Sequence, residues 1–234
     1  MGAIYRRELK SYFTSIIGFV VISIMFCLSG IFFWLGNLLS GTTDMSGTFS
    51  SLFLPLIFVI PLLTMRIFSE DRRQKTDQAL LTAPLSLIGL VMGKYLASVT
   101  VFLISISINF VFGIIINFYA APDWIVIFGN FLGLFLMGAA LIAVGMFFSA
   151  LTESQVIAAI TSLVGVLALF FLPDLLTLIP LDFVAVAARK ISCLDYYTQF
   201  TMGIISVTGI LFFVSLAAIF VYLTVKMMEK RRWG

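Results

Sequence analysis

Long runs of apolar residues, separated by short polar stretches, dominate the pattern along this chain. Each of six runs is about as long as the roughly 20 residues that an α-helix needs to cross the hydrocarbon core of a bilayer. The predicted spans cover residues 16–39, 49–68, 96–118, 124–151, 156–178 and 203–225. The pattern therefore predicts an all-α, polytopic membrane protein, with residues 1–234 forming a single transmembrane domain.

The connections between the predicted spans are short. Residues 119–123 join the third span to the fourth, and residues 152–155 join the fourth to the fifth, so both pairs are expected to be tight antiparallel hairpins. The longest pieces outside the spans, 69–95 and 179–202, are too small to bury a hydrophobic core of their own. Any domain that hydrolyses a nucleotide or captures a ligand must therefore belong to another chain.

A short amphipathic helix is predicted before the first span, over about residues 4–14. At about 100° per residue, its apolar side chains fall on one half of a helical wheel and its basic side chains on the opposite arc. The apolar half holds Ile4, Tyr5, Leu9, Tyr12, Phe13 and Ile16, and the basic arc holds Arg6, Arg7 and Lys10. This helix is expected to lie flat on the membrane surface. It is either a passive anchor on anionic lipid or a lever that also touches a partner.

The stretch 69–86 is dense in charges of both signs, then turns apolar and reaches a proline at Pro84, which a helix would not continue through. This pattern predicts a short helix with a polar docking face and with Leu80 and Leu81 toward the membrane. A solvated loop would also carry mixed charge, so the pattern alone leaves both interpretations open. The candidate docking residues are Glu70, Asp71, Arg72, Arg73, Gln74, Lys75, Thr76 and Asp77.

Composition narrows the class further. Of the 234 residues, 62% are hydrophobic and only 11% are charged, against about 25% charged residues in soluble domains. This excludes a soluble enzyme, a nucleic-acid-binding protein and a secreted disulfide scaffold. Cys27 falls in the middle of the first span and Cys193 in a loop, so both are expected to be free thiols.

The distribution of positive charge orients the chain. Six spans leave both termini on one side, and that side holds 12 of the 14 Lys and Arg residues, whereas Arg189 and Lys190 lie on the other. By the positive-inside rule, both termini are cytoplasmic and the protein is a multi-pass protein of the cell membrane.

Charged residues lie outside the predicted spans or near their ends, and the chain has no His. Proton-coupled carriers and intramembrane metalloproteases need buried carboxylates or His, so the pattern argues against both classes. No cofactor or metal is expected in this chain. Pairs of small residues such as Gly145 and Ser149 on the fourth span predict close helix packing, either within the chain or at a dimer seam.

Four segments together resemble the permease subunit of type 2 ATP-binding cassette (ABC) exporters, and among these most closely the gliding-motility-type (GldF-like) permeases. The segments are residues 4–13, residues 61–66 continuing into 70–86, residues 137–155 and residues 196–205. The second segment is the most specific, because a charged stretch followed by Leu-Leu-Thr-Ala-Pro-Leu-Ser does not arise from contact with lipid.

The resemblance implies a six-helix half-transporter that pairs with a second permease copy or paralogue and sits on two copies of a cytoplasmic ATP-binding subunit, which would carry ATP and Mg. It implies an interfacial helix with Tyr5, Arg6, Arg7, Glu8 and Lys10, a coupling helix over residues 70–84, and a minor cytoplasmic contact at Thr152, Glu153, Ser154 and Gln155. It also implies re-entrant helices over residues 180–200, with Tyr196, Tyr197 and Phe200 at an outer interface. No residue indicates the substrate.

Two other functions remain to be weighed against export. One is a membrane anchor for a mechanotransmission complex of the ABC type that translocates nothing. The other is a membrane-embedded lipid-processing enzyme with Glu70 and Asp71 as acids, but no His, paired intramembrane carboxylate or activated nucleophile accompanies them. We therefore expect a non-catalytic subunit with membrane lipid, but no nucleic acid, as a partner.

Overall fold

The computed structural model describes residues 1–75, 86–177 and 191–233, and these residues form helices and turns without a strand. Six helical stretches are long and apolar enough to cross a membrane, which confirms the predicted all-α polytopic fold. These stretches are Ile16–Leu38, Phe53–Arg73, Leu87–Asn117, Trp124–Leu151, Gln155–Thr177 and Val207–Arg231.

Several of these stretches are built from more than one helix. The described elements are α1 (Gly2–Thr14), α2 (Ile16–Phe33), the π-helical turn η1 (Trp34–Leu38), α3 (Ser46–Ser51), α4 (Phe53–Thr64), α5 (Ser69–Arg73), α7 (Leu87–Ile106), α8 (Ile108–Asn117), α9 (Trp124–Leu151), α10 (Gln155–Thr177), α12 (Cys193–Thr201) and α13 (Val207–Trp233).

Helix α9 is the centre of the bundle and contacts α4, α7, α10, α12 and α13. Its glycines allow this close packing. A Cβ atom at Gly133 would overlap Phe200, one at Gly138 would overlap the ring of Phe102, and one at Gly145 would overlap Thr64. The small residues of the fourth span are therefore used to pack helices within the chain, which is the first of the two alternatives that the sequence left open.

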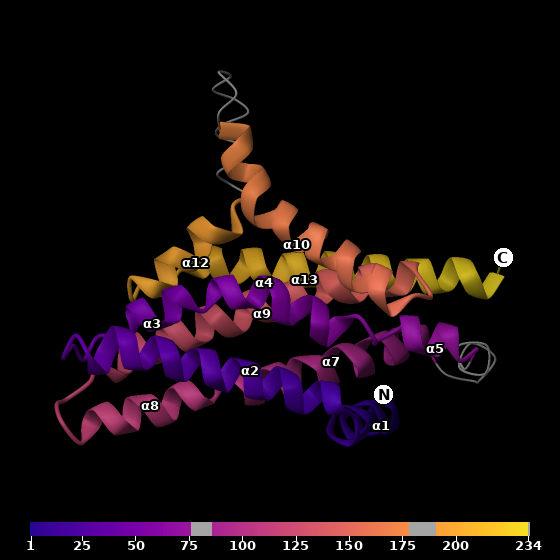
Figure 1. Ribbon diagram of the computed structural model, residues 1–234. Helices are drawn as coiled ribbons and strands as arrows, with labels where there is room; N and C mark the ends of the chain where they lie inside the picture. The colour runs from indigo at the N-terminus through magenta and orange to yellow at the C-terminus, as the bar shows by residue number, and fades with distance from the viewer. Residues whose placement is uncertain (76–85, 178–190, 234) are drawn as a thin grey trace.

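Helices at the periphery expose large apolar surfaces. In the most apolar 18-residue window of each helix, 67% of residues are buried in α9, but only 28% in α2 and α10 and 17% in α13. In Figure 1, the second half of α10 rises away from the other helices, next to α12. Such surfaces face lipid or another protein rather than water.

The third membrane-crossing stretch begins earlier than expected, at Leu87 rather than at residue 96, and contains a break. Ser86 caps α7 by accepting a hydrogen bond from the Gly89 N–H. At the other end, the chain breaks between α7 and α8, where the Ser107 hydroxyl donates to the Ile104 carbonyl at 2.7 Å. The charge of Lys94 interrupts the apolar run in the sequence, which is why the pattern placed the start too late.

Helix α12 lies within the region where re-entrant helices were expected, and residues 178–190 before it lie outside the described residues. Its aromatic residues do not form an outer interface as expected. Tyr197 is buried and donates to the Phe49 carbonyl at 2.6 Å, Phe200 packs onto Gly133, and half-buried Tyr196 stacks on Phe212. α12 is therefore part of the core between α3, α9 and α13.

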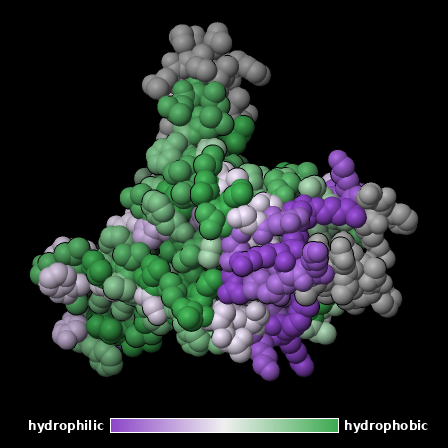
Figure 2. Space-filling model, turned by 45° about the vertical axis from the view of Figure 1, so that its right-hand side comes forward, coloured by the Kyte–Doolittle hydropathy of each residue, from purple (hydrophilic) through white to green (hydrophobic). Residues whose placement is uncertain are grey.

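Both termini and α5 lie at one end of the bundle, whereas α3 and the turn between α8 and α9 lie at the other (Figure 1). Hydrophilic surface gathers at one end of the molecule, and most of the remaining surface in that view is apolar (Figure 2). We call the end with α1 and α5 the charged end, because its ion pairs involve Glu8, Arg66, Asp71, Lys94 and Glu153.

Candidate functional site

A buried cation lies at the centre of the charged end. Lys94 is on α7, and its side chain is only 2% exposed. Its ammonium lies 2.7 Å from the Asp71 carboxylate on α5 and 3.2 Å from the Glu8 carboxylate on α1. It also donates a 2.7 Å hydrogen bond to the Ile67 carbonyl. Because an unpaired buried charge is very unfavourable, these three partners are what allow the lysine to be buried.

The partners of Lys94 come from elements far apart in the sequence. Glu8 also pairs with Arg7 at 2.6 Å, so two cations and two carboxylates form one balanced cluster. Burial lowers the pKa of Arg7, but the hydrogen bond and charge of Glu8, with the charge of Asp71, outweigh it and raise the pKa overall. We call Arg7, Glu8, Asp71 and Lys94 the Lys94 cluster. It joins α1, α5 and α7 at a single point.

Helix α1 packs on α7 through residues from Ile4 to Tyr12. A Cβ at Gly93 would come within 3.0 Å of Ile4, so the glycine sets how closely the two helices approach. Further along, the Tyr5 hydroxyl lies 3.1 Å from Thr100 Oγ1, and the Tyr12 hydroxyl lies 3.0 Å from Ser98 Oγ. Part of the predicted apolar face of α1 therefore meets protein rather than lipid.

The Tyr12 hydroxyl also donates to the Leu63 carbonyl at 3.1 Å, and burial raises the pKa of Tyr12, so its hydroxyl stays protonated as a donor. This bond connects α1 to α4 as well. The opposite face of α1 is exposed and carries Arg6, Arg7 and Lys10. α1 thus has one face fixed to the bundle and one basic face available to a membrane or a partner.

The chain is broken between α4 and α5, at residues 65–68, and side chains from other helices fill the break. Ser149 on α9 accepts hydrogen bonds from the Phe68 and Ser69 N–H groups at 3.2 and 3.3 Å, and donates to the Met65 carbonyl at 3.1 Å. The Ile67 carbonyl accepts the hydrogen bond from Lys94 that is described above. The polar backbone groups of a buried turn are thereby satisfied without continuous helix.

Two further ion pairs hold α5. Arg66 and Glu70 form a bidentate pair at 2.5 and 2.6 Å, one helical turn apart. Arg72 contacts Glu153 at 2.7 Å, which joins α5 to the turn between α9 and α10. The Arg66 and Glu70 side chains are each about three-quarters buried, whereas the Glu153 side chain is 67% exposed.

The structure brings many of the predicted site residues together but gives them different environments. Glu70, Asp71 and Arg72 are paired within the chain, whereas Arg73, Gln74 and Lys75 are exposed. α5 ends at Arg73, and Lys75 adopts a positive φ of 57°. Thr76 and Asp77, and the rest of the expected coupling helix through residue 85, lie outside the described residues.

At the predicted minor contact, α9 ends at Leu151 and α10 begins at Gln155. Thr152 Oγ1 accepts a hydrogen bond from the Ser154 N–H at 3.2 Å, which closes the turn, and Glu153 points outward to Arg72. The described part of the predicted coupling segment thus contacts the minor contact through Arg72 and Glu153.

Sequence reasoning did not assign Arg66, Lys94 or Ser149 to the site. The four-residue spacing of Arg66 and Glu70 was a usable signal, because residues at i and i+4 meet on a helix. Lys94 looked like a flanking lysine that reaches toward headgroups. Ser149 was visible only as the small partner of Gly145, and its hydrogen bonds depend on the tertiary fold.

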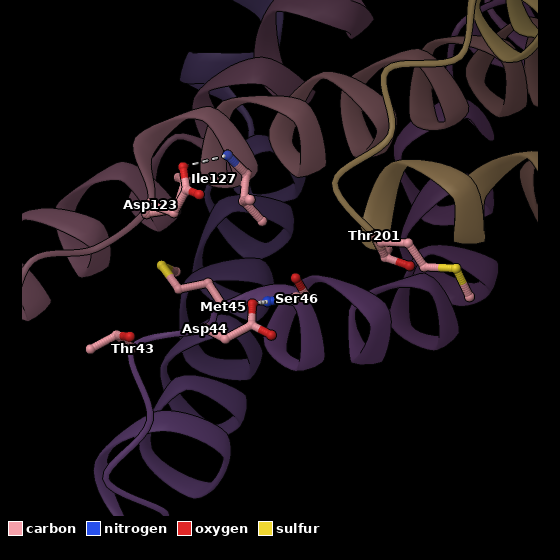
Figure 3. Close-up of a pocket in the computed structure, with 9 residues that line it drawn as sticks. Thr43, Asp44, Met45, Ser46, Asp123, Ile127 and Thr201 are labelled. Carbon is pink, nitrogen blue, oxygen red and sulfur yellow. Dashed lines mark hydrogen bonds between the residues drawn. The ribbon is translucent and has the colours of Figure 1, made fainter.

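The opposite end holds a pocket of about 490 Å³ with two carboxylates, shown in Figure 3. Asp44 accepts from the Ser46 N–H at 2.9 Å, and Asp123 caps α9 by accepting from the Ile125 N–H at 3.0 Å. Both carboxylates therefore serve local structure. Over the described ranges, His, Cys, Asp and Glu residues form no group of three that could hold a metal ion.

The family model for the ABC-2 family transporter protein matches residues 44–229. This match covers most of the chain, from just before α3 to the last turns of α13, so the protein belongs to the ABC-2 family. It is the membrane-spanning component of a transporter, and its family implies an ABC ATP-binding subunit as a partner. No curated protein matches the chain.

Proposed function

We propose that this chain is the permease subunit of an ATP-driven ABC exporter, with its charged end in the cytoplasm and with two permease chains forming the export pathway. The resemblance to gliding-motility-type permeases supports this assignment. ATP and Mg would bind to the ATP-binding subunit that the family implies as a partner. The excess of Lys and Arg on the same side supports the orientation.

The observation that carries the proposal is the Lys94 cluster. A force applied to α5 by a partner reaches α7 through Asp71 and Lys94, and reaches α1 through Glu8, over distances of 2.7 and 3.2 Å. α7 is one of the membrane-crossing helices, so motion outside the membrane is passed directly into the bundle. Such coupling needs a contiguous network of packed and charged side chains, which this end of the molecule provides.

We assign two roles to the predicted coupling residues, on the basis of their exposure and ion pairs. Glu70, Asp71 and Arg72 position α5, since each is paired with another part of the chain. Arg73, Gln74 and Lys75 are exposed and are available to the ATPase. The docking surface therefore begins at the end of α5, and Glu153 adds a second exposed point beside it.

The exposed positive charges of Arg73 and Lys75 allow a direct test of ATPase docking. The full chain is co-expressed with an ABC ATP-binding subunit from the same genome, and the yield of co-purified ATPase is measured. Arg73→Glu with Lys75→Glu should reduce that yield strongly and lower the ATPase rate of the complex. Arg189→Glu with Lys190→Glu makes the same charge change at positions expected on the other side of the membrane, and should leave both unchanged.

Equal behaviour of the two double variants would contradict the docking assignment. Export is tested separately, by ATP-dependent movement of cargo in vesicles containing the purified complex. A complex that hydrolyses ATP at a normal rate and moves no cargo, including lipid, would favour the alternative of a mechanical anchor.

A further inference from the structure

An apolar groove of about 730 Å³ runs between α7, α9 and α13. On α13 its lining residues recur every three or four positions from Phe213 to Glu229, so they form one continuous face of the helix. The groove is separate from the pocket at the opposite end and shares no residue with the Lys94 cluster.

The floor of the groove is packed protein and its edges are open to the surroundings. Val99, Ala139 and Phe213 are at most 9% exposed, whereas Ile88 and Val214 at the edges are 63% and 51% exposed. The Tyr95 hydroxyl, which lies among these apolar groups, donates to the Ala139 carbonyl at 3.1 Å and is thereby satisfied. The body of the groove is therefore suited to hydrocarbon.

The mouth of the groove carries two opposite charges. Lys226 and Glu229 both line it, their charged atoms lie 2.8 Å apart, and their side chains are 53% and 39% exposed. The Lys226 ammonium also lies 5.7 Å from the centre of the Tyr222 ring. Both charges thus remain accessible to a ligand at the place where the apolar lining ends.

The position of this mouth matches the depth of lipid headgroups. The part of α13 between Val207 and Val225 carries no charge, and at 1.5 Å per residue it is about 28 Å long. This is close to the roughly 30 Å thickness of the hydrocarbon core, so Lys226 and Glu229 lie where headgroups begin. The lining from Lys226 to Phe213 covers about 20 Å, more than one leaflet's share of that thickness.

We propose that this groove binds one glycerophospholipid with a primary-amine headgroup of the phosphoethanolamine type. One of its two acyl chains lies along α13, the phosphate faces Lys226, and the ammonium faces Glu229. A Lys–Glu pair is complementary to a phosphate and an ammonium on the same molecule. A purely anionic headgroup would leave Glu229 facing negative charge, and a quaternary ammonium has no N–H to donate to its carboxylate.

This site does not depend on the proposed transport function. The test uses the full chain, purified in a mild detergent and examined by native mass spectrometry. Phosphatidylethanolamine, phosphatidylglycerol and phosphatidylcholine with identical acyl chains are each added. The wild-type chain should retain phosphatidylethanolamine about fivefold more than either other lipid, because only this headgroup brings both a phosphate to Lys226 and a cationic N–H donor to Glu229.

Variants separate the headgroup from the acyl chain. Glu229→Gln removes the negative charge that faces the ammonium and should shift the preference to phosphatidylglycerol. Ala218→Trp fills the groove from an exposed lining position and should reduce retention of all three lipids. Lys230→Ala, on the same helix but not in the groove lining, is the matched control and should behave like the wild type.

Equal retention of the three lipids by the wild type, or a preference for phosphatidylglycerol, would overturn the headgroup assignment. If Glu229→Gln and Lys230→Ala had the same lipid preference, the charged mouth of the groove would have no role in selecting the headgroup. A cross-link between two chains through Ala218→Cys would place a second copy in the groove instead of lipid. Should Ala218→Trp fail to fold, the change of preference in Glu229→Gln still decides the proposal.

Discussion

Lys94 and Asp71 form a buried ion pair in which the ammonium and a carboxylate oxygen lie 2.7 Å apart, with the lysine side chain 2% exposed. The pair joins a membrane-crossing helix to the short helix at the charged end. Its burial makes it sensitive to the loss of either member, because the charge that remains loses its nearest opposite charge where water can replace it only in part.

Removing Asp71 should therefore destabilise the chain more than removing the whole pair. We expect Asp71→Ala to lower the free energy of unfolding by roughly 3 kcal/mol, near the low end for a broken buried pair, because Glu8 still lies 3.2 Å from Lys94. The double variant Asp71→Leu with Lys94→Met should lose less. Denaturant unfolding of the purified chain in micelles measures both.

The exposed pair of Arg72 with Glu153 supplies the control for this prediction. Glu153→Ala breaks a pair of similar length, at 2.7 Å, but its carboxylate side chain is 67% exposed. The expected change in unfolding free energy is about 0–1 kcal/mol. If Asp71→Ala and Glu153→Ala had equal effects, burial of the Lys94 cluster would have no energetic consequence.

Helix packing around α9 should depend on its glycines. Gly145→Ala places a methyl group against Thr64 at the end of α4, and overpacking of this kind costs about 1–3 kcal/mol. Gly47→Ala in α3 meets no atom within 4 Å and should be neutral or slightly stabilising. Thermal unfolding of the two variants in the same detergent gives the comparison, and a similar loss in both would contradict the packing described for α9.

The orientation of the bundle can be tested by labelling with a membrane-impermeant maleimide. Cysteines introduced at Thr43 and Asp123 should react in intact cells, whereas one introduced at Lys10 should react only after the membrane is opened. All three native side chains are exposed. Labelling of the Lys10 position from outside would reverse the proposed topology.

Of the two native cysteines, Cys193 should not interfere with that labelling. Cys193 is fully buried, and burial raises the pKa of its thiol to about 12, so at pH 8 almost none of it is the reactive thiolate. The folded chain should therefore resist alkylation at Cys193 at pH 8 and lose this resistance in denaturing detergent. Because the raised pKa favours the protonated thiol in the folded state, this contribution to stability should be lost as the pH rises toward 12. Mass spectrometry of the alkylated chain gives the site.

Hydropathy was sufficient to predict the six membrane-crossing stretches, because a bilayer imposes a minimum length of apolar helix. The same pattern also placed the basic face of α1 correctly, with Arg6 and Lys10 exposed. It did not predict what the apolar side of that helix contacts. Tyr5 and Tyr12 find Thr100 and Ser98 on α7, and such pairings depend on how two helices meet.

The candidate site was predictable as a region but not as a network. A charged stretch at residues 70–77 indicated a contact outside the membrane, and the resemblance gave it a role. Which of its charges are paired within the chain could not be predicted, since the partner of Asp71 is a lysine on the next membrane-crossing helix. The burial of Lys94 could not be predicted from hydropathy either. A hydropathy value describes a lysine without partners in water, whereas Lys94 is buried because other parts of the chain supply its partners.

The break at residues 65–68 has a mechanical consequence. In a continuous helix, a change of direction would require several backbone hydrogen bonds to be given up at once. Here those backbone groups are already bonded to the side chains of Ser149 and Lys94. The connection between α4 and α5 is therefore a hinge and not a continuous helix. The resistance of this hinge to bending is set by a few side-chain hydrogen bonds. Single substitutions at those side chains can therefore change its stiffness without changing either helix.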